Sequence, residues 1–324
     1  MSAASDGTPR VRLGIFPTPL YRLERISQKL QKNVYIKRDD MCGVALGGNK
    51  VRKLEYLLWD AIDQGCDTIL TTGGAQSNHA MLTAACCNRL GLSCILVLKK
   101  RGVTGLRGNL LLDDLLGAEV EFVDSDSYED VYARMERLCG ELERQGRKAY
   151  RIPVGGSVAR GSLGYAAAVE EIAAQTAACK VRLSDIICCT GSGGTHAGLL
   201  AGAALHLPQT RVTGVSVDPS VDFLEEVCNI ANATARLLGS QRVFSREDVH
   251  LHDCSGDGYA IPSQQGDSAM RMMAGLEGVI LDPVYTAKAF AGLLELLAAG
   301  YFEGRENLLF LHSGGAGGLF AFDR

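Results

Sequence analysis

The stretch DIICCTGSGGTHAGLLAGAAL, residues 185–205, decides the fold. Its first part, 185–189, is a short apolar run with β-branched residues and predicts a buried strand. A glycine-rich turn, 191–196, follows Thr190, and the apolar segment 197–205 is typical of a packed helix. Such a turn between strand and helix directs backbone N–H groups and the positive end of the helix dipole at an anion, which suits a phosphate.

The spacing of this turn excludes two familiar nucleotide-binding motifs. No Gly-Lys-Ser/Thr follows it, as a Walker loop requires, and His196 stands where the Gly-x-Gly-x-x-Gly fingerprint has its third glycine. A tight turn that binds no ligand is the alternative interpretation of the same residues.

The same alternation recurs along the 324-residue chain and predicts the α/β class. Strand-like runs followed by helical patterns occur at 33–37, 68–72, 93–98, 119–123, 185–189, 211–217 and 308–312. Seven strands are more than one mononucleotide-binding unit needs, so we expect two lobes, each a mostly parallel twisted sheet flanked by helices. We place the large lobe at residues 1–50 and 162–324 and the small lobe, inserted between them, at residues 51–161.

Composition narrows the function classes. The chain is 47% apolar, enough for a large core, and its net charge of −4 comes from interspersed acids and bases. Neither nucleic acid nor a membrane surface is therefore an expected partner. No leader-like segment opens the sequence and no run reaches the roughly 18 apolar residues of a spanning helix, so we expect a cytoplasmic protein. The 11 cysteines form no Cys-x-x-Cys pair and predict neither a disulfide framework nor structural zinc. Four cysteines lie in apolar stretches of the sequence, and we interpret them as buried small hydrophobes: Cys86, Cys87, Cys188 and Cys189.

The segment GGNKVRKLE, residues 47–55, contains a lysine in an unusual position. Apolar residues recur at helical spacing from Leu54 onward and Asn49 is a good N-cap, so Lys50 falls on the first residue of a helix. The helix dipole disfavours a cation there, which helps depress the lysine pKa and supply the neutral amine that a Schiff base needs. An exposed loop lysine is the alternative.

Two further glycine junctions end predicted strands. TTGGAQSNH, residues 71–79, and HSGG, residues 312–315, place hydroxyl, amide and imidazole groups at the ends of two strands. Ligands in open α/β sheets bind beyond such carboxyl ends. We therefore expect the four glycine-lined segments to converge on one cleft.

The histidines allow two interpretations. HLHDC, residues 250–254, has metal-ligand residue types, but histidines two apart also mark one face of a strand, and we predict no metal site. His79 and His196 are candidate acid–base groups or, equally, hydrogen-bonded residues at helix starts.

Together these segments resemble the D-cysteine desulfhydrase and 1-aminocyclopropane-1-carboxylate (ACC) deaminase family, pyridoxal-phosphate (PLP) enzymes of the tryptophan-synthase β-like fold, PLP fold type II. The resemblance covers nearly the whole chain after the first dozen residues. It rests on PTPL (17–20), KRDD (37–40), GGNKVRKLEY (47–56), GGAQSNH (73–79), GNLLLD (108–113), PVGGS (153–157), TGSGGTHAG (190–198), LDPVYTAKA (281–289) and HSGG (312–315).

The resemblance implies a set of site residues. Lys50 would bind PLP through a Schiff base, and Asn78 would bond the phenolic oxygen of the cofactor. The remaining implied cofactor contacts are the phosphate cradle Gly191, Ser192, Gly193, Gly194 and Thr195, together with Thr286 and Ser313. The implied substrate-binding residues are Gln76, Ser77, Asn78, His79, Tyr259 and Tyr285, and the implied catalytic residues are Lys50, Ser77, Tyr259 and Tyr285. The resemblance also implies a homodimer.

Ser313 stands where related lyases place a hydroxyl beside the pyridine nitrogen. A hydroxyl cannot fully protonate the ring, which favours the departure of a β-substituent. We therefore expect β-elimination from a small amino acid, with D-cysteine giving pyruvate, ammonia and hydrogen sulfide. L-Cysteate sulfo-lyase, which would release sulfite by the same steps, and ACC deaminase are the alternatives.

Thr286 favours the lyase over the deaminase. Deaminases of this family resemble one another in having Glu after the tyrosine of Asp-Pro-Val-Tyr, whereas desulfhydrases have Thr. A carboxylate near the pyridine nitrogen would stabilise the protonated ring that opening a cyclopropane demands, and a threonine hydroxyl cannot.

Two departures from the family pattern leave the specificity for the substrate side chain open, and the preferred enantiomer is open because both hands of cysteine present the same groups. The departures are Ala-Met-Leu at 80–82, where many relatives have polar or basic residues, and Val158, where Asn is usual. Outside the family, the competing classes are a nucleotide-dependent oxidoreductase and a non-catalytic protein that binds PLP or an amino acid.

Overall fold

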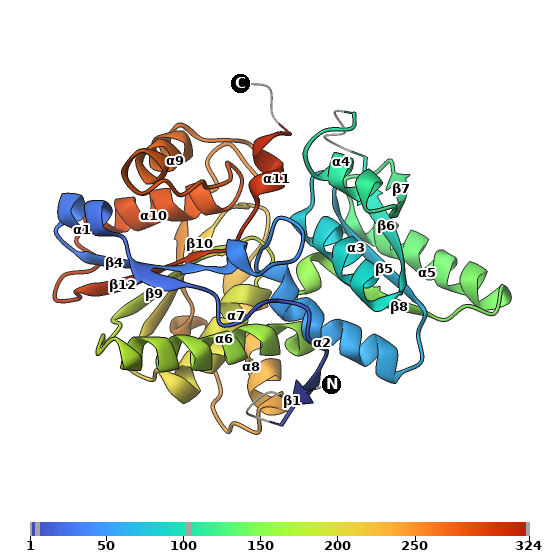
Figure 1. Ribbon diagram of the computed structural model, residues 1–324, viewed down its shortest axis with the longest axis horizontal. Coiled ribbons are helices and arrows are strands. Elements are labelled where there is room, and N and C mark those ends of the chain that lie inside the picture. The colour runs from blue at the N-terminus through green and yellow to red at the C-terminus, as the bar shows by residue number, and fades with distance from the viewer. Residues whose placement is uncertain (1, 4–6, 101–104, 322–324) are drawn as a thin grey trace.

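Two parallel sheets organise the chain in the computed structural model, which describes residues 2–3, 7–100 and 105–321 (Figure 1). The larger sheet has the strand order β11-β10-β9-β12-β4-β3. Its strands are β3 (Leu20–Arg22), β4 (Asn33–Arg38), β9 (Asp185–Thr190), β10 (Arg211–Ser216), β11 (His250–Asp253) and β12 (Asn307–His312). Only β3 runs antiparallel to its neighbour among these six strands, so the other five end at the same edge.

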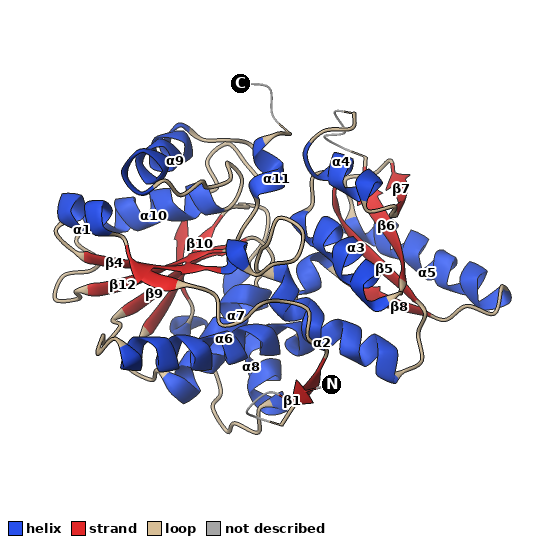
Figure 2. Cartoon of the chain, in the orientation of Figure 1, coloured by secondary structure: helices blue, strands red, loops and turns tan. Residues whose placement is uncertain are grey.

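The smaller sheet is entirely parallel, with the strand order β7-β6-β5-β8. Its strands are β5 (Thr68–Gly74), β6 (Ser93–Lys99), β7 (Glu119–Val123) and β8 (Ala149–Ile152). A separate short pair joins β1 (Ser2–Ala3) and β2 (Pro9–Arg10). Figure 2 shows the two main sheets as separate red layers, each enclosed by helices.

Helices cover both faces of the larger sheet. Successive strand residues point to opposite faces, and apolar residues on each face pack against a different set of helices. Ile187 packs with α1 (Glu24–Leu30), α9 (Gln264–Glu277) and α10 (Thr286–Ala298), whereas its neighbour Ile186 packs with α6 (Ala159–Ala178) and α7 (Gly194–His206). Outside α7 lies α8 (Phe223–Leu237), preceding the short 3-10 helix η3 (Arg246–Asp248). These layers fix the turns that follow β9 and β12.

The smaller sheet is covered in the same way. Leu70 faces α5 (Tyr128–Arg144), and Ile69 faces α2 (Lys50–Asp63) and α3 (Asn78–Leu90). Beside α3 lies α4 (Gly108–Leu115), which also packs against the last helix, α11 (Ala316–Leu319). Two single-turn 3-10 helices, η1 (Asp39–Met41) and η2 (Val154–Gly156), stand at crossings between the sheets.

A buried ion-pair network holds α2 against β4, η1 and α6. Arg52 pairs with Asp39 (Nη2 to Oδ1, 2.8 Å) and with Glu171 on α6 (Nη1 to Oε2, 2.9 Å), while Lys37 also contacts Glu171 and Tyr165 donates to Asp39. Burial alone would raise the pKa of Asp39, but Arg52 outweighs it and the pKa lies below the ordinary value. The helix that begins with Lys50 is therefore anchored two residues later.

The structure confirms the expected α/β architecture and all seven predicted strands, with ends that differ by at most two residues. The edge strand β8 escaped sequence prediction because its four residues, Ala-Tyr-Arg-Ile, form neither a long apolar run nor a regular alternation. The predicted lobe boundaries fall at the first residue of α2 and near the start of α6. Where the lobes divide stays a prediction.

Among the described residues, no helix combines the length and the apolar character that crossing a membrane requires.

Candidate active site

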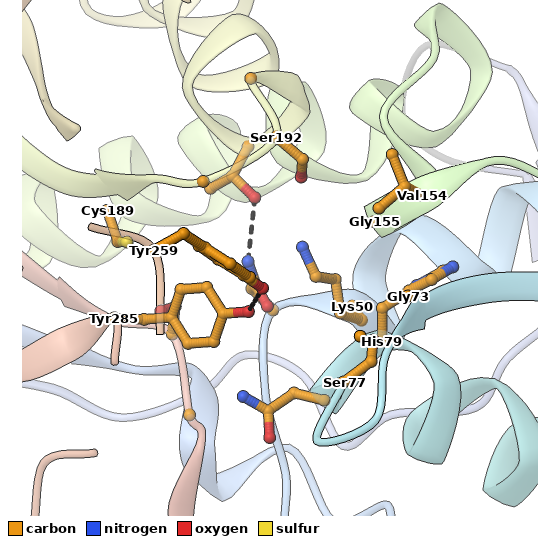
Figure 3. Close-up of a pocket in the computed structure, with 18 of the residues that line it drawn as sticks. Lys50, Gly73, Ser77, His79, Val154, Gly155, Cys189, Ser192, Tyr259 and Tyr285 are labelled. Carbon is orange, nitrogen blue, oxygen red and sulfur yellow. Dashed lines mark hydrogen bonds between the residues drawn. The ribbon is translucent and has the colours of Figure 1, made fainter. Parts of the chain in front are cut away.

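A cavity with about 670 Å³ of empty space, including its mouth, lies between the two sheets where glycine turns from both meet (Figure 3). The residues that line it are Asn49, Lys50, Gly73, Gly74, Ser77, Asn78, His79, Tyr128, Val154, Gly155, Cys189, Gly191, Ser192, Gly193, Thr195, Tyr259, Tyr285, Ser313 and Gly314. The predicted convergence of four glycine-lined segments on one cleft is confirmed.

Backbone contacts tie three of these segments together. Gly48 and Gly314 form an antiparallel bridge, with φ of +142° and +90°, a region that favours glycine. The amide of Asn49 donates to the carbonyl oxygen of Ser313 at 3.0 Å. Its side chain does not cap α2 as expected, because Nδ2 donates instead to Thr195 Oγ1 at 3.0 Å. Asn49 thus joins the start of α2 to the start of α7.

Lys50 is the first residue of α2, as the sequence predicts, and its side chain extends into the cavity (Figure 3). Burial lowers the pKa of Lys50 to about 8, since removal from water disfavours the ammonium form. A neutral amine is therefore present in a useful fraction near neutral pH, which is what a carbonyl-binding lysine requires.

The turn after β9 forms one wall of the cavity. Gly193 has φ +74° and precedes α7, so the positive end of a 13-residue helix faces the cavity beside the Ser192 and Thr195 hydroxyls. Gly194 lies behind this wall: a Cβ there would stand 2.7 Å from Lys53 Nζ and 2.8 Å from Ser157 Oγ. Backbone amides, hydroxyls and helix dipole together suit a phosphate group.

The opposite wall is the start of α3. Ser77 caps this helix by accepting from the Ala80 amide at 3.2 Å, and Asn78 is its first residue. Gln76, expected at the substrate, is not among the lining residues. Its Oε1 accepts from the Asn109 amide at 2.8 Å and its Nε2 donates to the Arg107 carbonyl oxygen at 3.1 Å, so α4 holds it away from the cavity.

Two tyrosines that are distant in sequence close another side (Figure 3). Tyr259 follows β11 and Tyr285 is the N-cap of α10; their hydroxyls are hydrogen-bonded and their rings lie edge to face, with centroids 6.1 Å apart. Burial raises the pKa of both phenols above the ordinary value. Lys288, fully buried, donates to the carbonyl oxygens of Ser255 and Gly258 and so supports the segment that carries Tyr259.

Ser313 lines the cavity, but Thr286 does not. The Thr286 side chain is fully buried at the start of α10 and its hydroxyl donates to Asp282 Oδ1 at 2.6 Å. The implied cofactor contact of Thr286 is therefore not part of the cavity wall, because the Asp282 carboxylate that caps α10 binds this hydroxyl.

The two candidate acid–base histidines, His79 and His196, differ in their position relative to the cavity. His79 lines the cavity, with Nε2 2.9 Å from Thr71 Oγ1, and burial holds its pKa well below the usual value, so the ring is neutral. His196 is fully buried outside the lining, beside Thr190, and burial lowers its pKa to about 4. Its position at the start of α7 fits the structural interpretation.

Sequence reasoning missed several lining residues. Cys189, interpreted as a buried hydrophobe, is 9% exposed and lies at the cavity, one residue before the end of β9. Tyr128, Val154 and Gly155 come from the start of α5 and from η2, both in the part of the chain that forms the smaller sheet. A strand end predicts Cys189 to be near the site, but nothing in the local sequence around Tyr128 does.

His252 and Cys254 lie away from the cavity, on β11 and just after it, and contact Glu295 on α10. Glu295 Oε2 lies 3.0 Å from His252 Nε2 and 3.4 Å from Cys254 Sγ. These three side chains satisfy one another by hydrogen bonds, which accounts for their proximity.

Comparisons with known proteins agree with this geometry. The sequence model of the family described as "Pyridoxal-phosphate dependent enzyme" matches residues 11–314. The chain is 42% identical to a D-cysteine desulfhydrase of Salmonella choleraesuis (strain SC-B67) and 41% identical to one of Salmonella paratyphi C (strain RKS4594). Each alignment spans 320 residues, 97% of this chain and 96% of the relative. A crystal structure of an ACC deaminase homologue superposes with TM-score 0.89 at 40% identity, covering 96% of this chain and 93% of the other.

Proposed function

The chain belongs to the family of pyridoxal-phosphate dependent enzymes, and from this premise we propose that it is a D-cysteine desulfhydrase. The reaction converts D-cysteine and water into hydrogen sulfide, pyruvate and ammonia. The observation that carries the proposal is the meeting, in one cavity, of a buried lysine of lowered pKa, a helix N-terminus with hydroxyls and a protonated tyrosine pair. The likeness in sequence to curated D-cysteine desulfhydrases supports the choice of substrate.

The residues of the cavity fit the cofactor. Lys50 would hold its aldehyde carbon, the turn from Gly191 to Thr195 its phosphate, and Asn78 its phenolic oxygen. The Ser313 hydroxyl, which has no hydrogen-bond partner among the described residues, would meet its ring nitrogen. When bound, PLP withdraws electrons from Cα of the amino acid, so that the Cα proton and then the β-substituent can leave.

Lys50 takes the Cα proton on Nζ. Its pKa of about 8 leaves roughly a tenth of this amine unprotonated at pH 7, far more than an ordinary lysine has. The tyrosine pair, both phenols protonated because burial raises their pKa, donates a proton to the departing sulfur. Protonated sulfur leaves more readily than sulfur that departs with a negative charge, so this proton accelerates the elimination.

The start of α3 binds the carboxylate of the substrate. Ser77 and Asn78 stand at the positive end of a 13-residue helix, which favours an anion. His79, neutral and bonded to Thr71, contributes shape and polarity rather than charge. The substrate is thereby held with its Cα toward Lys50.

ACC deaminase is the second candidate, favoured by the superposition on a homologue of that enzyme. Ring opening requires a group that keeps the pyridine nitrogen protonated, and Ser313 is a neutral hydroxyl. Position 286 is a threonine and so supplies no carboxylate, and its hydroxyl is bound by Asp282. Both observations favour elimination.

The experiment is a parallel assay of the purified, PLP-loaded enzyme on D-cysteine, L-cysteine, L-cysteate and ACC. Equal amounts of sulfide and pyruvate from D-cysteine, with at least tenfold lower kcat/KM on the others, are expected. Sulfite from L-cysteate or 2-oxobutanoate from ACC as the main product would reject the proposal. The Lys50→Ala variant, expected to be colourless and inactive, is the control for uncatalysed release.

We also propose that the protein is a homodimer and that it acts in the cytoplasm. The family resemblance supports a homodimer, which light scattering of the purified protein would test against a monomer of 34.6 kDa. The chemistry of a small amino-acid substrate supports a place in the cytoplasm, which fractionation of the source cells would test.

A further inference from the structure

Asn109 is a fully buried residue of α4 that does not line the cavity and yet contacts a residue that does. Its Nδ2 donates to Asn78 Oδ1 at 2.7 Å and to the backbone carbonyl oxygen of Gln76 at 2.9 Å. Its own amide donates to Gln76 Oε1 at 2.8 Å. Asn109, at the start of α4, thus makes three hydrogen bonds to the segment 76–78.

These contacts fix which way the Asn78 carboxamide points. A backbone carbonyl oxygen can only accept, so the Asn109 atom that faces the Gln76 carbonyl must be the NH2 group. The same NH2 group faces Asn78, and therefore the facing atom of Asn78 must be its oxygen. The NH2 group of Asn78 is left without a partner among the described residues, on a side chain that lines the cavity.

Only the NH2 group of the Asn109 carboxamide is hydrogen-bonded among the described residues. Its Oδ1 is buried without a hydrogen-bond partner, and a Cβ on Gly317 of α11 would lie 2.0 Å from it. Turning the Asn109 amide over would place Oδ1 against two oxygen acceptors and lose both hydrogen bonds. The backbone carbonyl of Gln76 therefore sets the orientation of Asn109, and Asn109 that of Asn78.

We propose that Asn109 is a positioning residue that locks the Asn78 carboxamide with its NH2 group presented to the cavity, as the donor for the phenolic oxygen of the cofactor. The proposal rests on PLP occupying this cavity and is independent of which amino acid is the substrate. It gives a function to the GNLLLD segment (108–113), to which the reaction assigns none.

The test uses the visible absorbance of bound PLP as a function of pH, with Asn109→Asp and Asn109→Ala. An aspartate at 109 can only accept, so Asn78 must turn its NH2 group toward it and away from the cavity. A phenolic oxygen without its donor is more basic, and the midpoint of the spectral titration should rise by about one unit in both variants.

Asn88→Ala is the matched control. Asn88 Nδ2 donates to the Leu116 carbonyl oxygen at 2.8 Å and so joins α3 to the far end of α4 without contacting Asn78. Its spectral midpoint should equal that of the wild type. If the Asn109 variants also leave the midpoint unchanged, or if Asn88→Ala shifts it equally, Asn109 merely staples helices and the proposal is wrong.

A double-mutant cycle guards against variants that are poorly folded. In an Asn78→Ala background the donor is already gone, so Asn109→Ala should cause no further shift of the midpoint. An equal shift in both backgrounds would overturn the proposal. Wild-type enzyme that shows the PLP spectrum but releases no sulfide from D-cysteine would refute the proposed function and leave this test in force.

Discussion

Tyr259 and Tyr285 are hydrogen-bonded hydroxyl to hydroxyl in the cavity, although one follows a strand and the other begins a helix. The Tyr259 side chain is 38% exposed, but its hydroxyl is bonded to a second phenol and burial of the hydroxyl raises the pKa of each tyrosine, so both stay protonated near neutral pH. The pair is therefore a proton donor of fixed position in the cavity that also holds Lys50.

Replacing either tyrosine with phenylalanine should slow sulfide release from D-cysteine by about 10²- to 10⁴-fold, because the departing sulfur loses its proton donor. With β-chloro-D-alanine, whose chloride leaves without a proton, the loss should be below about tenfold. Pyruvate release from both substrates measures this. An equal loss on both would assign the pair to placing the substrate, and Tyr301→Phe, outside the cavity, should change neither rate.

Capture of the cofactor by apoenzyme should depend on pH through Lys50. The neutral amine is the reactive form, and burial lowers the pKa of Lys50 to about 8, so the rate should rise with pH and level off above that value. Stopped-flow absorbance after mixing apoenzyme with PLP between pH 6 and 10 gives the midpoint. A midpoint near the ordinary lysine value of 10.5 would contradict the burial argument.

The Arg52→Met variant should lose about 3–5 kcal/mol of stability, because it leaves Asp39 and Glu171 as carboxylates without their buried partner. The pKa of both acids is lowered in the folded state, so their contribution is present above the ordinary values of 3.8 and 4.5 and is lost as pH falls through the folded values. Denaturant unfolding at several pH values should therefore show a smaller difference from wild type at acid pH.

Arg134→Met is the control for this loss. Arg134 pairs with Glu121 and Glu141, but its side chain is 23% exposed and those acids are 33% and 40% exposed. Such a partly exposed network contributes at most about 1 kcal/mol. A comparable loss in the two variants would mean that burial of the Arg52 network is not what stabilises it.

Lys288 does not line the cavity, yet Lys288→Met should lower kcat/KM by about 10- to 100-fold. The carbonyl oxygens of Ser255 and Gly258 would lose the donor that fixes the segment before Tyr259. Limited proteolysis should cut this segment faster. Lys100→Met, at an exposed pair with Asp124, is the control. An unchanged rate with faster cleavage would show that the segment needs no support for catalysis.

The strand ends and their glycine turns were predictable because both signals are local. The run before Thr190 and the glycines after it predict a βα junction, and junctions of parallel strands meet at one edge. Lys50 was found for the same reason, as a cation at the start of a recognisable helix.

What could not be predicted depends on tertiary partners. Gln76 has the residue type of a substrate ligand, but Arg107 and Asn109 at the start of α4, 31 and 33 residues further on, bind the two ends of its amide. The Thr286 hydroxyl is bound by Asp282, and the sequence does not reveal which of two competing partners it meets. The sequence indicates that the helix dipole helps to lower the Lys50 pKa, whereas the structure shows burial as the main cause.

Cys189 brings a second nucleophilic atom to the cavity, and its environment decides whether it competes with Lys50 for an aldehyde. Burial, reinforced by Asp282, raises the Cys189 pKa well above its usual value, so the thiolate is scarce. At pH 7 about a tenth of an amine with a pKa near 8 is free. Burial thus makes the Lys50 amine more reactive and the Cys189 thiol less reactive. An aldehyde in this cavity is therefore expected to form an imine with Lys50 rather than to be attacked by Cys189.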